Sequence, residues 1–287
     1  MERICRLVLR FVSVLPLALV LPALIACEQI DSPKPTPVPT ATYAPPTQPP
    51  LPTAIPTTPP LLGEGTSIVI GGELRKRGDP STASEQVGTL PDGAPVKVVA
   101  VVKGENWLVG AQTWVSTAPE WTTDWYQLDD GTYIYSAFIF TLLPGESSPL
   151  RDPAGAEKWI DVNVSAQTAT AMIGDQAVHI ALATTGSPEF PSPLGRHDIE
   201  PDGRVSLVDM TASQAGYAPE QASYNVERVL FTQYIDRYGN AIHLNYWRPD
   251  EVYGNTATSH GCVGLSLHDA QYFWLFGEPG MRVEIHE

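Results

Sequence analysis

The sequence predicts an all-β, mainly strand-built protein, because three observations agree. Short runs alternate apolar and polar residues, as in 159–164, and this is the period of a half-buried strand. Turn signals such as Pro-Asp-Gly at 91–93 and Asp-Asp-Gly at 129–131 separate the runs. Only one segment, 267–276, has the features of a helix. We therefore expect two strand-rich modules, 64–144 and 156–287, with one short helix near the end.

The first 26 residues are expected to be an export leader. Arg3, Arg6 and Arg10 form a basic start, and residues 11–26 that follow carry no charge. A basic start followed by a short apolar run is typical of a secretory signal. A transmembrane anchor is the alternative, but the sixteen residues of this run are short for a span, which needs about 20.

The leader ends at Leu24-Ile25-Ala26-Cys27, which resembles a bacterial lipobox. The resemblance implies cleavage before Cys27 and a lipid on that cysteine, which would hold the protein to a membrane by its buried methylenes. Simple secretion is the remaining alternative. With lipidation, the chain is extracytoplasmic, anchored to the cell membrane, and faces the cell wall.

Residues 27–63 are expected to form a linker, because 31–62 hold 12 of the 28 prolines and seven threonines. Proline fixes φ and donates no backbone hydrogen bond, so this stretch cannot join a sheet or helix. An extended stalk that lifts the modules off the membrane follows from this composition.

Charge and cysteine content limit the possible partners. The net charge of −15 makes nucleic acid an unsuitable partner. Of the three cysteines, Cys5 leaves with the leader and Cys27 takes the lipid. Cys262 then has no disulfide partner, and an unpaired thiol outside the cytoplasm points to a reactive role. No signal for an oligomeric state is present.

The module at 64–144 contains strand-like runs at 96–102, 107–109, 113–115 and 133–135. Residues 74–82 and 87–93 resemble the start of a bacterial SH3-like domain, and 107–109 and 132–136 resemble its later strands. The resemblance implies a small β-barrel that binds wall or peptide, and a spacer without a ligand is the alternative. We expect its aromatic residues to be core rather than a ligand platform: Trp107, Trp114, Trp121, Trp125 and Tyr126.

The second module has strand patterns at 159–164, 178–182, 229–231, 242–246 and 283–285. Alternation over 178–182 places the apolar residues inside and His179 on the solvent face.

The predicted helix has recognisable ends. Ser266 followed by Asp269 three residues later is a capping pair, and Gly277 is a stop signal.

The tetrapeptide Ser259-His260-Gly261-Cys262, with His243 upstream, carries the chemistry. A thiolate is the nucleophilic form of cysteine, and a nearby imidazole can take the thiol proton. His260 would share a face with Cys262 on an extended segment, whereas His243 can approach from another strand. The amides of Gly261 and Cys262 could stabilise an oxyanion.

This pattern resembles the L,D-transpeptidase catalytic domain (YkuD-type), in which a histidine precedes a Ser/Thr-His-Gly-Cys segment. Further similar segments are Thr184-Thr185-Gly186, Ser192-Pro193-Leu194-Gly195 and the helix that carries Asp269, Ala270, Tyr272 and Trp274.

The resemblance implies a β-sandwich with a short helix after the cysteine, and defined residue roles. Cys262 is the nucleophile, His243 the general base, and the Leu244 backbone carbonyl orients the base. His260 supports the oxyanion site, together with the loop residues Gly261 and Ser259. Tyr246, Trp247 and Arg248 follow the base and could line the substrate cleft.

The implied reaction joins peptidoglycan stem peptides into cross-links through a thioester, without a metal or nucleotide cofactor. Two positions depart from the family pattern: Leu244 stands where Gly or Ser is more usual, and Gly264 stands where Asn or Arg is usual. Three alternatives stay open: an L,D-carboxypeptidase that uses water, a wall-binding lipoprotein with a decayed site, and a zinc site built from His243, His260 and Cys262.

Overall fold

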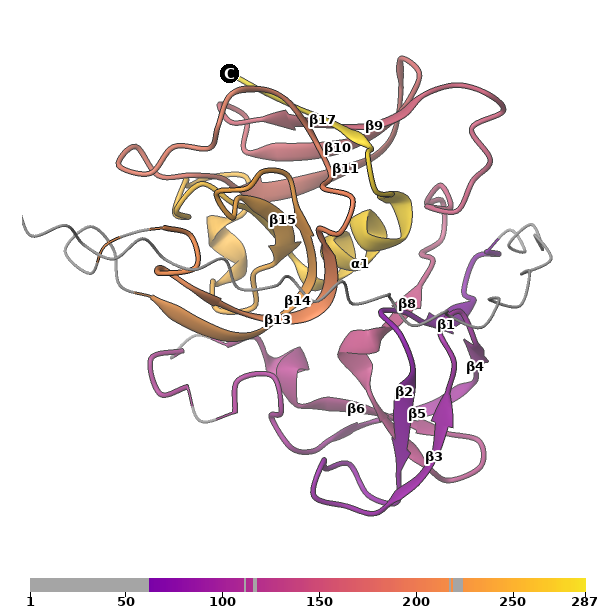
Figure 1. Ribbon diagram of the computed structural model, residues 1–287. Coiled ribbons are helices and arrows are strands. Elements are labelled where there is room, and N and C mark those ends of the chain that lie inside the picture. The colour runs from indigo at the N-terminus through magenta and orange to yellow at the C-terminus, as the bar shows by residue number, and fades with distance from the viewer. Residues whose placement is uncertain (1–61, 111, 116–117, 217, 219–223) are drawn as a thin grey trace, which may run out of the picture. The chain divides into compact units, whose positions relative to one another are not determined.

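The computed structural model describes residues 62–287, except 111, 116–117, 217 and 219–223. Within this part, strands dominate, and the predicted all-β class is confirmed (Figure 1). The leader, the Cys27 lipidation site and nearly all of the linker lie outside the described residues. No described helix is long and apolar enough to cross a membrane.

The first group of strands forms two small sheets. A five-stranded sheet has the order β3-β2-β7-β6-β5, and a three-stranded sheet has the order β4-β1-β8. Their bounds are β1 Ser67–Val69, β2 Leu74–Arg77, β3 Gln86–Leu90, β4 Pro95–Val96, β5 Val98–Lys103, β6 Asp124–Leu128, β7 Tyr133–Tyr135 and β8 Ile139–Thr141, with 3-10 helices η1 Glu120–Thr123 and η2 Ser136–Phe138. The assignment of this group to an SH3-like barrel with the bounds 64–144 stays a prediction.

Two predicted strands of this group are wrong. Residues 107–109 form a turn, and Thr113 and Trp114 lie in another turn. Leu108 and Val109 are nevertheless buried, as members of the hydrophobic core cluster, and Trp107 packs against it. The Arg228 guanidinium lies 5.2 Å from the Trp107 ring centroid and hydrogen-bonds the Trp107 carbonyl. Local apolar character predicted a strand, but the segment is buried by tertiary packing as a turn.

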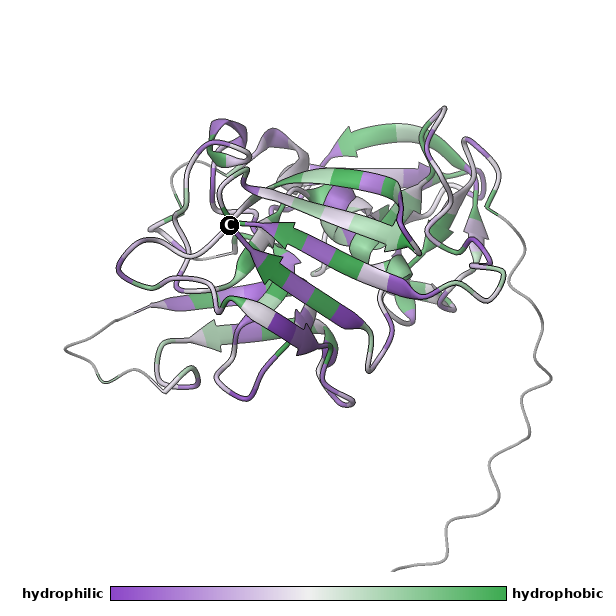
Figure 2. Cartoon of the chain, turned by 90° about the horizontal axis from the view of Figure 1, so that it is seen from above, coloured by the Kyte–Doolittle hydropathy of each residue, from purple (hydrophilic) through white to green (hydrophobic). Residues whose placement is uncertain are grey.

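The second group forms one nine-stranded sheet in the order β12-β17-β9-β10-β11-β16-β15-β14-β13. Burial alternates along β9 and β17, which pair in parallel, and the hydropathy pattern along the strand that leads to the C-terminus follows it (Figure 2). The bounds are β9 Lys158–Asn163, β10 Thr168–Ile173, β11 Gln176–Thr184, β12 Gly195–Asp198, β13 Arg204–Thr211, β14 Asn225–Tyr234, β15 Ala241–Leu244, β16 Val263–Leu265 and β17 Arg282–His286, with the 3-10 helix η3 Asp250–Val252.

The predicted helix is confirmed as α1 (Leu267–Phe276), the one α-helix among the described residues, with its predicted ends. The Ser266 side chain accepts a hydrogen bond from the Asp269 amide, and Gly277 follows the last turn. Tyr272, Phe273 and Phe276 are buried, so tertiary packing rather than helix propensity stabilises this short element.

The predicted facing of β11 is wrong. Ile180 and Leu182 are 65% and 55% exposed, whereas Ala181 and Ala183 are buried. His179 points inward and stacks on Tyr272 at 3.9 Å between ring centroids. His179, Ala181 and Ala183 therefore form the inward face of this strand, and its bulky aliphatic residues face outward.

Two carboxylates, from Glu146 and Asp269, explain why His179 is tolerated on the inward face of β11. The Glu146 Oε1 lies 3.2 Å from Nδ1 of His179 and 2.9 Å from Nε2 of His268, and Asp269 Oδ1 lies 2.9 Å from Nε2 of His179. Both ring nitrogens of His179 therefore have a carboxylate partner.

The two groups of strands share one hydrophobic core. Trp125, Tyr135 and Phe140 of the first group belong to the same cluster as Phe231 and Tyr272 of the second. All described residues fall in one compact unit.

A buried glutamine adds polar contacts across this core. The Gln271 amide nitrogen donates to the carbonyl oxygens of Ala137 at 2.8 Å and Ile139 at 3.0 Å.

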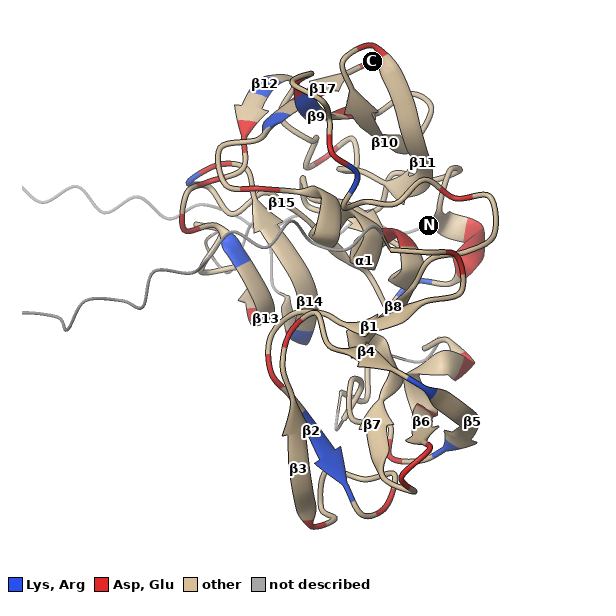
Figure 3. Cartoon of the chain, turned by 90° about the vertical axis from the view of Figure 1, so that its right-hand side faces the viewer, with Lys and Arg blue, Asp and Glu red and all other residues tan. Residues whose placement is uncertain are grey.

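Lys, Arg, Asp and Glu occur in both groups of strands (Figure 3). Part of the positive charge of strand β2 is balanced by an ion pair between Lys76 and Asp130. In β17, Arg282 Nε lies 2.9 Å from Glu157 Oε1. Such exposed pairs contribute little to stability, so the shared core carries most of the folding free energy.

Gln271→Met tests the connection between the two groups. The change keeps the chain length but leaves two buried carbonyls without donors, so we expect a loss of about 1–3 kcal/mol in the free energy of unfolding. Urea denaturation measures it, and Gln176→Met at an exposed position of β11 is the matched control. Equal midpoints for both variants would contradict the expected role.

Candidate active site

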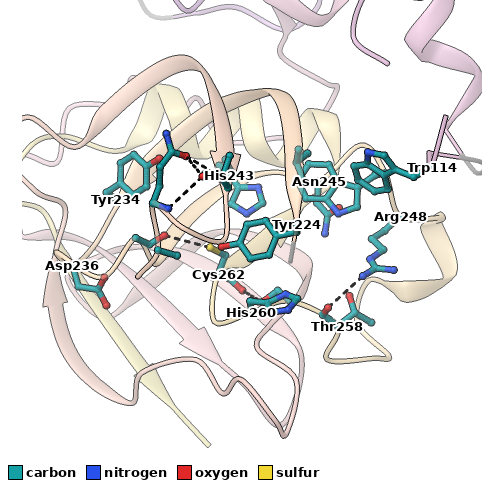
Figure 4. A pocket seen from close by; sticks show the side chains of 18 of the residues that line it. Trp114, Tyr224, Tyr234, Asp236, His243, Asn245, Arg248, Thr258, His260 and Cys262 are labelled. Carbon is teal, nitrogen blue, oxygen red and sulfur yellow. Dashed lines mark hydrogen bonds between the residues drawn. The ribbon is translucent and has the colours of Figure 1, made fainter. Parts of the chain in front are cut away.

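Strands β15 and β16 bring the predicted nucleophile and base to neighbouring positions. They pair in parallel, with Ile242 opposite Val263 and His243 opposite Gly264. Cys262 lies just before β16. Because side chains alternate faces along a strand, Cys262 and Gly264 share one face, and His243 shares its face with Asn245. His243 and Cys262 both line the same pocket (Figure 4).

The His243 ring is held by its own strand end. Its Nδ1 lies 2.8 Å from the Leu244 carbonyl oxygen, so Nδ1–H donates there and Nε2 keeps its lone pair. Trp247 stacks on the ring with 5.6 Å between centroids. Burial lowers the pKa of His243 to about 4, although the Leu244 hydrogen bond acts in the opposite direction. The imidazole is thus neutral at pH 7 and able to accept a proton.

Cys262 is a free cysteine and half-buried. Burial raises the pKa of Cys262 to about 11, against the opposing effect of the Ala241 backbone N–H. A thiol with this pKa and an imidazole with a pKa of about 4 are both neutral at pH 7. The resting site therefore holds a neutral thiol and a neutral imidazole, and the Cys262 thiol donates to the Gly239 carbonyl at 3.7 Å. To act as a nucleophile, this thiol would have to lose its proton.

Gly261 is needed for the sharp loop before the cysteine. Its φ is 112°, and a Cβ there would lie 2.2 Å from Asn240 Oδ1. Ser192 Oγ donates to the Gly261 carbonyl at 2.8 Å, and Ser259 Oγ donates to the Cys262 carbonyl at 2.6 Å. These bonds fix the backbone on both sides of the sulfur.

The expectation that the Gly261 amide faces an oxyanion is wrong. This amide donates to Ser259 Oγ at 3.1 Å, because the tight loop turns it back on itself. The Cys262 amide makes no hydrogen bond to the described residues, which leaves it as the backbone donor beside the sulfur.

His260 also lines the pocket, from the loop that precedes Cys262. Its ring contacts Phe190 at 4.4 Å and Tyr224 at 4.9 Å between centroids. Burial, and then the nearby Arg248 charge, lower the pKa of His260. A half-buried neutral imidazole can act as a hydrogen-bond donor at the pocket wall.

The pocket has a volume of about 440 Å³ and contains both expected and unexpected residues. Trp247 and Arg248 line it, as the sequence suggested. Tyr246 does not line the pocket, because it is buried in the core. Its hydroxyl donates to the Glu227 carbonyl at 2.6 Å and accepts from Gln112 Nε2 at 2.7 Å.

Trp114 also departs from its expected place in the core. Its side chain is 50% exposed and it lines the pocket, with its ring 6.4 Å from that of Trp247. Gln112, two residues earlier, holds this segment in place, because its Oε1 accepts from the Glu227 amide at 2.9 Å. The first group of strands thus supplies one wall of the pocket.

Sequence reasoning missed several pocket residues, among them Tyr224, Tyr234, Asp236, Asn245 and Thr258. Only Asn245 had a local signal, since it follows His243 by two residues and strand alternation puts both on one face. Thr258 directly precedes the Ser259-His260-Gly261-Cys262 segment, and the remaining three lie on other parts of the chain without a pattern that marks them. Within the described residues, no group of three His, Cys, Asp or Glu side chains is arranged to hold a metal ion.

Comparison with known proteins gives a family match for the segment that holds these residues. Residues 157–285 match the family model of the L,D-transpeptidase catalytic domain (YkuD). No curated protein sequence matches the chain.

Several solved structures share limited similarity. An L,D-transpeptidase in complex with imipenem is 18% identical, with a TM-score of 0.42 over 56% of this chain and 66% of that one. An L,D-transpeptidase from Mycobacterium smegmatis is 19% identical, with a TM-score of 0.40 over 57% and 66%. L,D-transpeptidase 3 from Mycobacterium tuberculosis, with a faropenem-derived adduct, is 15% identical, with a TM-score of 0.42 over 79% and 96%. The chain therefore spans just under two thirds of the first two structures.

The two pKa values predict how Cys262 responds to pH. Alkylation by iodoacetamide requires the thiolate, so the rate at pH 7 should be low and rise about tenfold per pH unit until the pKa of about 11 is reached. The measurement is the alkylation rate by intact mass from pH 6 to 11.5. A rate already constant at pH 7 would indicate a preformed thiolate–imidazolium pair instead.

Proposed function

We propose that this chain is an L,D-transpeptidase that forms peptidoglycan cross-links through a thioester on Cys262. One observation carries the proposal. A neutral His243, fixed by the Leu244 carbonyl, lies with Cys262 in a pocket open to solvent. The match of residues 157–285 to the L,D-transpeptidase catalytic domain supports the choice of reaction.

The first half-reaction acylates the enzyme. The Cys262 thiol proton passes to Nε2 of His243 as the sulfur attacks the carbonyl carbon of the third residue of a stem tetrapeptide. The tetrahedral intermediate collapses, the C–N bond to the terminal D-alanine breaks, and the departing amine takes the proton from His243. A thioester on Cys262 and free D-alanine result.

The second half-reaction transfers the acyl group. An amine from a neighbouring stem attacks the thioester carbonyl while His243 accepts an amine proton. The C–S bond breaks, the proton returns to the sulfur, and a new amide links the two stems. In both halves the Cys262 amide and the His260 ring are the donors nearest the developing oxyanion.

The Leu244 carbonyl contributes by keeping the proton on Nδ1 of His243. With Nδ1 committed as a donor, only Nε2 can act as the base, and the ring cannot rotate away without losing a buried hydrogen bond.

The location proposed for this activity is outside the cytoplasm. Lipid on Cys27 would anchor the chain to the membrane, and the proline-rich segment 27–63 would let it reach the wall. Residues 64–144 would then act as an SH3-like module that binds wall peptide. The net charge of −15 disfavours nucleic acid as a partner.

Imipenem, the compound in one of the similar structures, serves as a probe of acylation. We expect the purified protein to gain one covalent adduct by intact mass, because the β-lactam carbonyl is an activated acyl donor for Cys262. Cys262→Ala should gain none. An adduct that persists in Cys262→Ala, or no adduct on the wild type, would contradict the proposal.

Product analysis separates transfer from hydrolysis. With disaccharide tetrapeptide as the substrate, transfer should give cross-linked dimers in addition to D-alanine, detected by mass spectrometry. Trimmed tripeptide monomers without dimers would show that water replaces the amine.

Trp114→Ala tests the wall supplied by the first group of strands. Because Trp114 faces the pocket beside Trp247, its loss should lower kcat/KM on disaccharide tetrapeptide by about tenfold through a higher KM. The iodoacetamide rate should stay the same. Val101→Ala, at a 57% exposed position of the same group, is the control. Equal kcat/KM for both variants would contradict a substrate contact.

A further inference from the structure

Asn245 carries a side-chain oxygen that has no hydrogen-bond partner in the described part of the chain. The residue is 2% exposed, and it nevertheless lines the pocket together with His243 and Cys262. Its Oδ1 is buried and forms no hydrogen bond to the described residues. Buried polar atoms nearly always have a partner, so an exception calls for a specific explanation.

The backbone of Asn245, by contrast, is fully paired. Its amide donates to the Leu265 carbonyl at 2.9 Å, and its carbonyl accepts from the Tyr253 hydroxyl. These bonds extend the β15–β16 pairing by one residue and fix the direction of the side chain. The Asn245 side chain is therefore held in a fixed position by an ordered backbone.

Gly264 provides the space for this amide. A Cβ on Gly264 would lie 2.6 Å from Asn245 Nδ2 and 2.9 Å from Asn245 Cβ, so any side chain at 264 would displace the asparagine. Gly264 pairs with His243 across the two strands and follows Cys262 by two residues. The amide thus lies in the row of side chains that includes the base and the nucleophile.

We propose that Asn245 is a substrate-binding residue, which hydrogen-bonds a backbone peptide group of the bound stem peptide. The inference rests on the proposed function for the class of ligand. A carboxamide offers one acceptor and two donors, which matches the carbonyl and N–H of a peptide group. The bound peptide supplies the missing partner, and the amide orients it over Cys262.

Asn245→Leu gives the primary test, because leucine has a similar shape and no polar atoms. In a Cys262→Ala background, which prevents turnover, calorimetry measures the Kd of a stem tetrapeptide ending in D-alanine. We expect Asn245→Leu to raise this Kd about 10- to 100-fold, with an unchanged or higher urea midpoint. Asn225→Leu, at an exposed position of β14, is the control and should leave the Kd unchanged.

A second pair of variants keeps the test independent of that substitution. Gly264→Ala should weaken binding like Asn245→Leu, since its Cβ pushes the amide away. The exchange Asn245→Gly with Gly264→Asn returns an amide to the same space from the neighbouring strand, and it should recover part of the affinity.

The outcomes separate this inference from the proposed function. If Asn245→Leu binds the tetrapeptide like its parent, the inference fails, even if imipenem acylates Cys262. A lower urea midpoint with an unchanged Kd would assign Asn245 to packing and would also overturn it. If the parent binds the tetrapeptide in an Asn245-dependent way but wild type is not acylated, the inference stands and the transferase proposal fails. No tetrapeptide binding by the parent would overturn both.

Discussion

The parallel pairing of β15 and β16 is the constraint on which the site depends. Parallel strands place residues of equal register side by side, and here His243 faces Gly264 across the pair. Cys262 directly precedes β16 and Asn245 directly follows β15, and both lie on the face that holds His243 and Gly264. The strand pair thus brings together the proposed base His243, the Cys262 sulfur and the Asn245 amide, with Gly264 leaving the space for that amide. The segment between the strands has to leave the sheet and return, and its residues Trp247, Arg248, Thr258 and His260 form one side of the pocket.

Burial has opposite effects on the two titrating groups. Desolvation disfavours any charged form, so it lowers the pKa of His243 and raises the pKa of Cys262. A site arranged in this way keeps its thiol protonated at rest, which limits unwanted oxidation of the cysteine. In the proposed reaction, the thiolate forms only when a substrate carbonyl accepts the electron pair while His243 takes the proton. Fixing Nδ1 on the Leu244 carbonyl ensures that this proton goes to one nitrogen.

The first group of strands is part of the same folded body as the second. Gln112 and Gln271 are both buried and both donate across the two groups, the first to Tyr246 and the second to the carbonyls of 137 and 139. Such buried bonds are costly to break, so the segment that carries Trp114 is held firmly beside the pocket. A substrate contact from this group is therefore compatible with a rigid site.

Several features could be derived from the sequence by itself, because they depend on local patterns. Strand alternation and turn residues determined the all-β class, and the Ser266 cap and Gly277 determined the ends of α1. The His243 to Cys262 spacing selected two residues that the structure brings to the same pocket. Tertiary structure decided which face of β11 is buried, since His179 packs on Tyr272 of α1 and Ala181 and Ala183 are buried, whereas Ile180 is exposed. It also placed Tyr246 in the core and Trp114 in the pocket, and set Asn245 against Gly264. The physical reason is that a local pattern specifies the period of an element, whereas the partner that buries each face comes from a distant part of the chain.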